Sequence, residues 1–337
     1  MRSWIRESGL AAPRARAREG TDVEYSFDLQ PEAPEAVLNP PEQAVASSKA
    51  RTLGSEAWGR LKKNKLAIAA CIWLLFVVVV AVTADLWVPQ TLGGPNEVAT
   101  TDMADNSRLP PSLEHPFGTD TLGRDVLSRV IYGARVSLIV GLVSTGISIV
   151  IGVVAGGIAA YYGGIWDSII MRLADIFLSF PYTLFVIAMI AVLGNGIENV
   201  FIAIGLLGWP STARVFRSAV LSVKENDYVD AARAMGASDL RIMLHHIVPN
   251  AANTIFVYST MDIGGAILTE AALSYLGLGV VPPDPSWGSI IQDGQQYLQT
   301  EPWLLILPGI VICLTVLSFT LLGDGLRDAL DVKMVDA

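Results

Sequence analysis

Two carboxylates stand inside long apolar segments of the chain, Asp262 and Glu270. A charged side chain at membrane depth is costly, so it faces protein or a water-filled cavity and marks a functional site by default. Such carboxylates could bind amines or cations along a substrate pathway. They could equally pair with polar groups of the helix bundle or lie at the membrane interface. Both alternatives stay open for each residue at this point.

Other chemistries find little support in the residue types present. Cys71 and Cys313 lie inside apolar runs without ligand-like neighbours, and the chain has only 3 histidines, so we predict neither a disulfide framework nor a metal site. No nucleophile stands beside a suitable base, so we predict no catalytic residue. No Gly-Lys dipeptide occurs, so the Walker A phosphate-binding pattern is absent, and any energy from ATP must come through another polypeptide.

Bulk composition indicates a membrane protein. Of 337 residues, 52% are hydrophobic and 16% are charged, whereas a soluble domain carries about a quarter charged residues. The net charge of -9 argues against nucleic-acid binding, which requires a clustered basic surface. We therefore expect lipid, and no nucleic acid, around this chain.

The apolar segments have the lengths and spacing of six membrane-spanning helices. About 20 apolar residues are needed to cross about 30 Å of hydrocarbon. The predicted spans are about 66–88, 136–161, 176–193, 199–213, 251–276 and 303–323. The fourth is short, and its amphipathic continuation through Val215, Phe216 and Val220 could extend the helix. Residues 1–55 lack a sustained apolar period, so we expect a disordered cytoplasmic tail before a membrane domain over 56–337.

The distribution of basic residues sets the orientation of these spans, because Lys and Arg favour the cytoplasmic side. Four of them directly precede the first span: Arg60, Lys62, Lys63 and Lys65. Others fall in segments that this orientation makes cytoplasmic: Arg172, Arg214, Arg217, Lys224, Arg233, Arg241, Arg327 and Lys333. We therefore predict that both termini are cytoplasmic.

The most patterned polar segment is 227–250, between the fourth and fifth spans. Asp227 is a suitable helix N-cap, and Gly236 stands where a left-handed residue would end that helix. Residues at helical spacing predict one apolar face: Tyr228, Ala231, Ala232 and Met235. Ser238 can cap a second helix, which Pro249 would end or kink. The apolar face of that helix would hold Leu240, Leu244, Ile247 and Val248.

Segments on the predicted outer side carry amphipathic and aromatic signals. Residues 124–132 have an apolar face and predict an interfacial helix. Trp287, which follows several prolines, is a suitable anchor at the membrane interface. In the second span, Gly152 and Gly156 have the small-xxx-small spacing, which favours close helix packing.

The sequence "DAARAMGASDLRIMLHHIVPN" resembles the EAA loop of permease subunits of ABC importers. That loop has an acidic residue, two alanines, a glycine four positions later and a proline near its end. Here those positions are occupied by Asp230, Ala231, Ala232, Gly236 and Pro249. The segments "HPFGTDTLGRDVLSRVIYGARVSL" and "ILTEAALSYLGLGVVPPDPSWGSII" are similar to segments of the dipeptide/oligopeptide/nickel permeases, in the same order. The resemblance covers the chain from about Arg60 onward.

The resemblance implies an all-α integral membrane fold of the type I ABC importer permease in a bacterial inner membrane. It implies three kinds of partner: a second, homologous permease subunit, two cytoplasmic ATPase subunits and an extracytoplasmic substrate-binding protein. ATP and Mg would be bound by the ATPases, and no cofactor by this chain. Residues 217–250 would form the coupling loop. Its ATPase-coupling residues would be Tyr228, Asp230, Ala231, Ala232, Arg233, Gly236 and Pro249.

The resemblance further suggests that Arg124 and Trp287 border the docking surface of the binding protein. The leading hypothesis is import of di- or oligopeptides by alternating access. The same machinery could carry nickel complexes or other small solutes, because selection is largely delegated to the binding protein. A second hypothesis is an ion-coupled secondary transporter, in which Asp262 and Glu270 would be the coupling carboxylates. A membrane enzyme ranks last.

Overall fold

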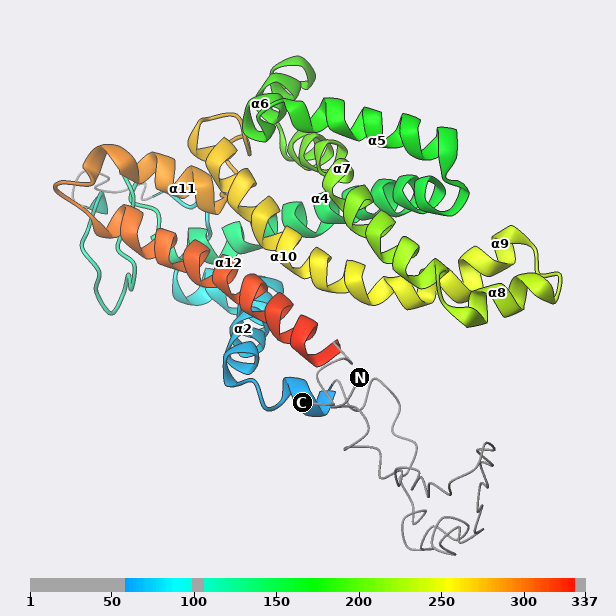
Figure 1. The fold of residues 1–337 in the computed structure, drawn as a ribbon. Coiled ribbons are helices and arrows are strands. Elements are labelled where there is room, and N and C mark those ends of the chain that lie inside the picture. The colour runs from blue at the N-terminus through cyan, green and yellow to red at the C-terminus, as the bar shows by residue number, and fades with distance from the viewer. Residues whose placement is uncertain (1–57, 99–105, 331–337) are drawn as a thin grey trace, which may run out of the picture. The chain divides into compact units, whose positions relative to one another are not determined.

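The computed structural model describes residues 58–98 and 106–330, so the predicted tail over 1–55 lies outside the described residues. Apart from one isolated bridge between Thr119 and Asp125, the regular structure in these ranges is helical (Figure 1). Its long helices are α2 (Lys65–Thr91), α4 (Val126–Tyr162), α5 (Gly164–Ser179), α6 (Tyr182–Leu193), α7 (Ile197–Lys224), α10 (Val248–Tyr275) and α12 (Trp303–Leu330). The shorter elements are α8 (Asp227–Ala234), α9 (Asp239–Ile242), a π-helical turn (Met243–Ile247), α11 (Trp287–Gly294) and a 3-10 turn (Gln295–Tyr297).

The membrane-spanning character of these helices is clear for part of the chain. Three described helices are long and apolar enough to cross a membrane: α2, α4 and α12. Helices α5 and α6 meet the same criterion as a pair, but they are bent by 88° at their junction. Helices α7 and α10, with 28 residues each, reach about 42 Å at about 1.5 Å per residue, but both carry more polar residues. The count of six spans and the cytoplasmic termini stay predictions.

Helix boundaries differ from the predicted spans in an informative way. Residues 176–193 do not form one straight element, because the bend at Phe180 and Pro181 divides them between α5 and α6. The extension of the short fourth span is confirmed, since α7 runs without a break to Lys224. Phe216 and Val220 lie fully buried on this extension. The helix is therefore held by packing well beyond its apolar stretch.

Helices α4 and α7 form the central contact of the bundle. A β-carbon added at Gly156 would lie 2.3 Å from the carbonyl oxygen of Ala213, and one at Gly152 would lie 2.5 Å from Cβ of Thr212. The two glycines therefore let the backbones approach, as their spacing predicts. Ser148 and Thr212 share a hydrogen bond of 2.9 Å across the same contact.

The predicted interfacial helix over 124–132 is wrong. Most of these residues form the first turns of the 37-residue helix α4 rather than a separate surface element. Val126, Val130 and Ile131 on that segment are buried within the protein. The apolar face that suggested contact with the membrane surface instead packs against other helices.

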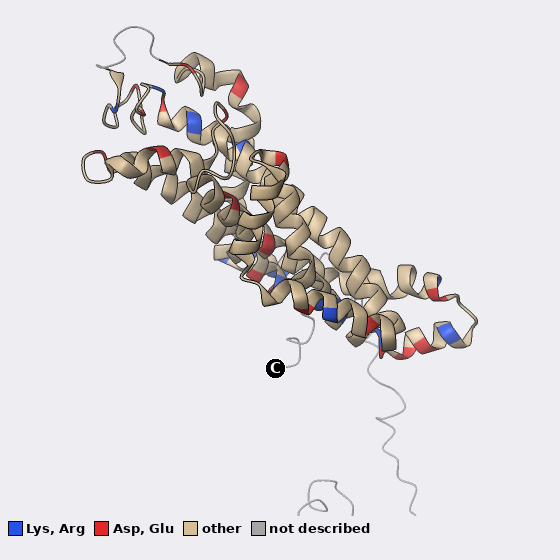
Figure 2. Ribbon diagram, turned by 90° about the horizontal axis from the view of Figure 1, so that it is seen from above, with Lys and Arg blue, Asp and Glu red and all other residues tan. Residues whose placement is uncertain are grey.

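Charged residues gather toward the two ends of the described helices, with fewer between them (Figure 2). Two ion pairs fasten α5 to α7. Arg217 donates two hydrogen bonds of 2.6 Å to Asp167, and Arg214 pairs with Asp175. Because α5 buries only Ala174, these pairs are its principal polar attachment to the bundle.

Candidate functional site

Helix α8 projects from the junction of α7 and α10 (Figure 1). Its N-cap is Asn226, so the prediction that Asp227 caps it is wrong by one position. Val229 and Ala232 turn inward and are buried beside Ile242. Ala232 therefore belongs to the core rather than to the exposed apolar face on which the sequence placed it.

The outward side of α8 carries exposed apolar residues. Tyr228, Ala231 and Met235 lie at positions i, i+3 and i+7 and are all exposed, Met235 to 82%. We call these three residues the outer face of α8. Methionine and aromatic side chains are enriched at protein interfaces. The outer face has the chemistry of a docking surface.

Two charged residues lie beside the outer face and leave it uncovered. Arg233 donates to Asp230 at 2.9 Å, and both side chains are largely exposed. An exposed pair of this kind adds at most about 1 kcal/mol of stability, so either partner can exchange it for a contact to another protein. The structure thus brings Asp230 and Arg233 together beside the outer face.

Gly236 ends α8 in the manner that the sequence predicts. Its backbone φ is +83°, a left-handed conformation that glycine adopts without strain. The amide of Gly236 donates to the carbonyl of Arg233, and the amide of Ala237 donates to that of Ala232. These two bonds make a Schellman motif. No atom lies within 4 Å of an added β-carbon, so the requirement for glycine here is one of backbone conformation, not of space.

The segment after Gly236 departs from its predicted pattern. Ser238 occupies the N-cap position of α9, but its side chain makes no capping hydrogen bond, and α9 has only 4 residues before it passes into the π-helical turn. Ile242 and Ile247, five residues apart, are both fully buried across the π turn, whose hydrogen bonds join residues five apart rather than four. The predicted face is therefore wrong: Leu240 and Leu244 are exposed. Pro249 stands in the first turn of α10.

Two hydrogen bonds link the segments on either side of α8 to the end of α4, in addition to apolar packing. The hydroxyl of Tyr161, near the end of α4, donates to Oδ1 of Asp239 at 2.6 Å. The ammonium group of Lys224, at the end of α7, donates to the carbonyl of Tyr161 at 2.6 Å. Sequence reasoning missed these anchors, because each joins residues more than 60 positions apart. These hydrogen bonds connect α9 to the end of α4, and the end of α4 to the end of α7.

The two carboxylates of α10 occupy different environments. Glu270 is fully buried and accepts hydrogen bonds from Ser137 at 2.8 Å and from Ser274 at 2.7 Å. Both serines are polar groups of the helix bundle. They fit the interpretation in which Glu270 pairs within the bundle. Asp262 is half-buried and accepts one bond, of 3.2 Å, from Thr145.

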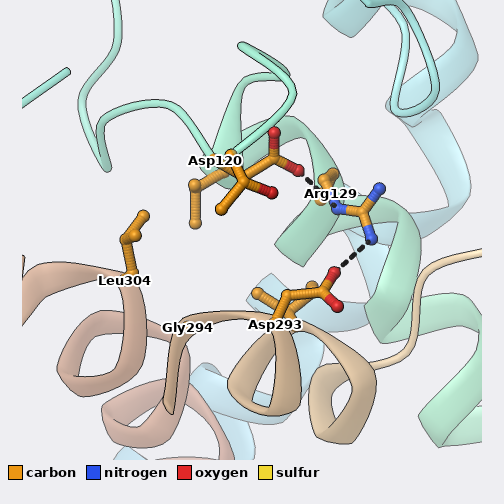
Figure 3. Close-up of a pocket in the computed structure, with 8 residues that line it drawn as sticks. Asp120, Arg129, Asp293, Gly294 and Leu304 are labelled. Carbon is orange, nitrogen blue, oxygen red and sulfur yellow. Dashed lines mark hydrogen bonds and ion pairs between the residues drawn. The ribbon is translucent and has the colours of Figure 1, made fainter. Parts of the chain in front are cut away.

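Two acidic and two basic residues form a network at the opposite end of the bundle, which Figure 3 shows in part. Nε of Arg124 lies 2.6 Å from Asp120, and Arg129 lies 3.7 Å from Asp120 and 3.5 Å from Asp293. Burial raises the pKa of Asp293, and the two arginines oppose that shift. The space between these groups is about 10 Å³, which holds at most one water molecule. The network thus joins α4, α11 and the segment before α4, and is no solute site.

Arg124 and Trp287 need correction as candidates for a surface that meets a binding protein. Trp287 is fully buried and its indole nitrogen donates to the carbonyl of Val130 at 2.9 Å. The Arg124 side chain is only 11% exposed and is held by Asp120. The residue types suggest an exposed position for both, but the chain itself covers them.

Comparison with known proteins agrees with this architecture. Residues 148–336 match the family described as the binding-protein-dependent transport system inner membrane component. Residues 52–111 match the N-terminal TM domain of oligopeptide transport permease C. The chain is similar in fold to a solved structure of the MetNI methionine ABC transporter in inward facing conformations, with a TM-score of 0.50 and 20% identity. That likeness covers 60% of this chain and 97% of the solved one.

Curated relatives match over nearly the whole length. The glutathione transport system permease protein GsiD of Shigella boydii serotype 4 is 42% identical over 300 residues, covering 89% of this chain and 97% of the relative. The GsiD protein of Escherichia coli O157:H7 gives the same values. The family match and these relatives show a multi-pass inner membrane component of a transport system. The chain belongs to the binding-protein-dependent permeases of ABC importers, in the peptide/nickel family.

Proposed function

We propose that this chain is one of two permease subunits in an ATP-driven importer of glutathione or other short peptides. The observation that carries the proposal is the exposed outer face of α8, at the position where the EAA resemblance places the ATPase contact. The 42% identity to permeases named for glutathione transport supports the substrate class. A second, homologous permease subunit would complete the pathway, and an extracytoplasmic binding protein would deliver the solute.

The proposed coupling follows from how α8 is attached. Two cytoplasmic ATPase subunits, which would hold ATP and Mg, bind the outer face of α8 on this chain and the equivalent face on its partner permease. Their closure on ATP moves α8. The bonds of Tyr161 to Asp239 and of Lys224 to Tyr161 carry that movement to α4 and α7. The helix bundle then alternates between inward-open and outward-open arrangements. On this proposal the chain itself performs no hydrolysis.

Uptake by reconstituted vesicles tests the proposal. The permease pair, the ATPases and the binding protein are placed in proteoliposomes, and entry of labelled glutathione and of a labelled dipeptide is followed. We expect uptake that requires enclosed ATP and external binding protein. Uptake driven by a proton or sodium gradient in vesicles without ATPase would overturn the proposal in favour of secondary transport. ATP-dependent uptake of a nickel complex, but of neither peptide, would retain the machinery and overturn the substrate.

A further inference from the structure

One face of α10 is polar along its length. Thr254, Tyr258, Asp262, Gly265 and Thr269 recur at intervals of three and four residues, which places them on one side of the helix. Thr254 and Gly265 are exposed, and the other three are partly buried in the single chain. We call them the polar stripe of α10. Because polar and ionisable side chains avoid hydrocarbon, a stripe of this composition at membrane depth faces protein or water rather than lipid.

A cavity lies beside the α9 end of this stripe. Its volume is about 510 Å³, and it is lined by Thr254, Tyr258 and Met261 of α10, by Val215 of α7 and by Arg327 of α12. A cavity of this volume lies in the range that small solutes occupy. Its wall includes hydroxyl groups and a guanidinium, so it can hold water and polar solutes. The polar stripe leads from this cavity toward the middle of the helix.

Asp262 stands on the stripe next to Met261 of the cavity wall and has no basic partner among the described residues. Thr145 donates its one hydrogen bond within the chain. Tyr182 and Tyr258 lie near enough to interact with the carboxylate electrostatically, but both are neutral hydroxyl side chains. Among residues 58–98 and 106–330, no Lys, Arg or His lies within ion-pair distance of Asp262. A carboxylate at this depth is stabilised by a cationic partner, and the described chain supplies none.

We propose that Asp262 is a station on the translocation pathway that binds the ammonium group of an amine-bearing solute. Tyr258 and Thr145 flank the bound group, and Arg327 attracts the solute's carboxylate at the cavity. A free peptide such as glutathione carries both kinds of group. This inference rests on the proposed function and adds to it a residue that recognises substrate within the membrane. Glu270 has no such role, because two serines already bond its fully buried carboxylate.

The test compares glutathione with N-acetylglutathione, which lacks the ammonium charge. Uptake of each is measured in proteoliposomes that contain the whole transporter, either wild type or with Asp262→Asn. Asparagine keeps the size of the side chain and can still accept from Thr145, but it carries no charge. We expect Asp262→Asn to slow glutathione uptake at least tenfold more than it slows uptake of the acetylated compound. For each compound, the uptake rate of the wild type is divided by that of the variant, and the value for glutathione divided by the value for N-acetylglutathione is the double ratio. The binding protein is identical in both vesicles, so its own selectivity cancels from the double ratio.

Two further variants separate recognition from folding. Asp262→Glu restores the charge and is expected to recover a large part of the wild-type preference for glutathione over the acetylated compound. Glu270→Gln is expected to give a double ratio near one. A double ratio near one for Asp262→Asn would overturn the inference, whether uptake of both compounds fell together or neither changed. Failure of the proposed function looks different, because wild-type vesicles would then show no ATP-dependent peptide uptake at all.

Discussion

Replacing Met235 with glutamate is expected to weaken binding of the ATPase subunits at least tenfold and to reduce ATP-dependent uptake in proportion. Met235 is the most exposed residue of the outer face of α8, so the folded permease tolerates the new charge. In a docked complex the same charge would be buried against an apolar groove without a partner. Such a burial costs several kcal/mol, and each 1.4 kcal/mol changes affinity about tenfold. Co-purification and titration of the ATPase onto the permease pair measure the effect.

Leu113→Glu is the matched control for this prediction. Leu113 is also a fully exposed apolar residue, on the segment before α4 rather than on α8. The control variant is expected to bind the ATPase as the wild type does. Equal ATPase affinity for Met235→Glu and wild type, with both permeases folded, would show that α8 does not form the contact.

Replacing Glu270 with alanine is expected to lower the free energy of unfolding by about 3 kcal/mol, the second large effect. The change leaves the hydroxyls of Ser137 and Ser274 without their partner and opens a cavity in the core. Buried polar groups without partners cost about 1–3 kcal/mol each, and cavities add to that cost. Thermal unfolding of the purified permease in detergent gives the size of the loss.

Glutamine at position 270 distinguishes a structural carboxylate from an ion-coupling one. Its amide can accept from one serine and donate to the other, because hydroxyl groups do both. We expect Glu270→Gln to retain most of the stability and the uptake of the wild type. If uptake were lost while stability was retained, the charge itself would be essential, as it would be in an ion-coupled transporter.

Much of the fold can be predicted from sequence because its determinants are local. The apolar segments locate the long helices, and the glycines of α4 predict a close helix contact, which the structure makes with α7. The same holds at the end of α8. There the glycine at position 236 is enough to predict a left-handed backbone conformation, because another residue type would be strained in it.

What sequence could not supply depends on contacts between distant residues. Trp287 suits a membrane interface by composition, yet its partner Val130 is 157 positions away and buries it. The π turn before Pro249 shifts the face of the second loop helix, with the amide of Val248 reaching back to Met243. The spacing predicts the wrong face for Ala232, because this short helix has two apolar sides. The larger Val229 decides which of them is buried.

A site-directed cross-link tests the central claim most directly, namely that the outer face of α8 contacts an ATPase. Cys71 and Cys313 are replaced by alanine, Met235→Cys is introduced, and the new thiol carries a photoreactive group in the assembled transporter. Illumination is predicted to join this chain to an ATPase subunit, whereas the same group on Leu113→Cys gives no such product. An assembled complex that hydrolyses ATP but shows no cross-link from position 235 to the ATPase would contradict the account.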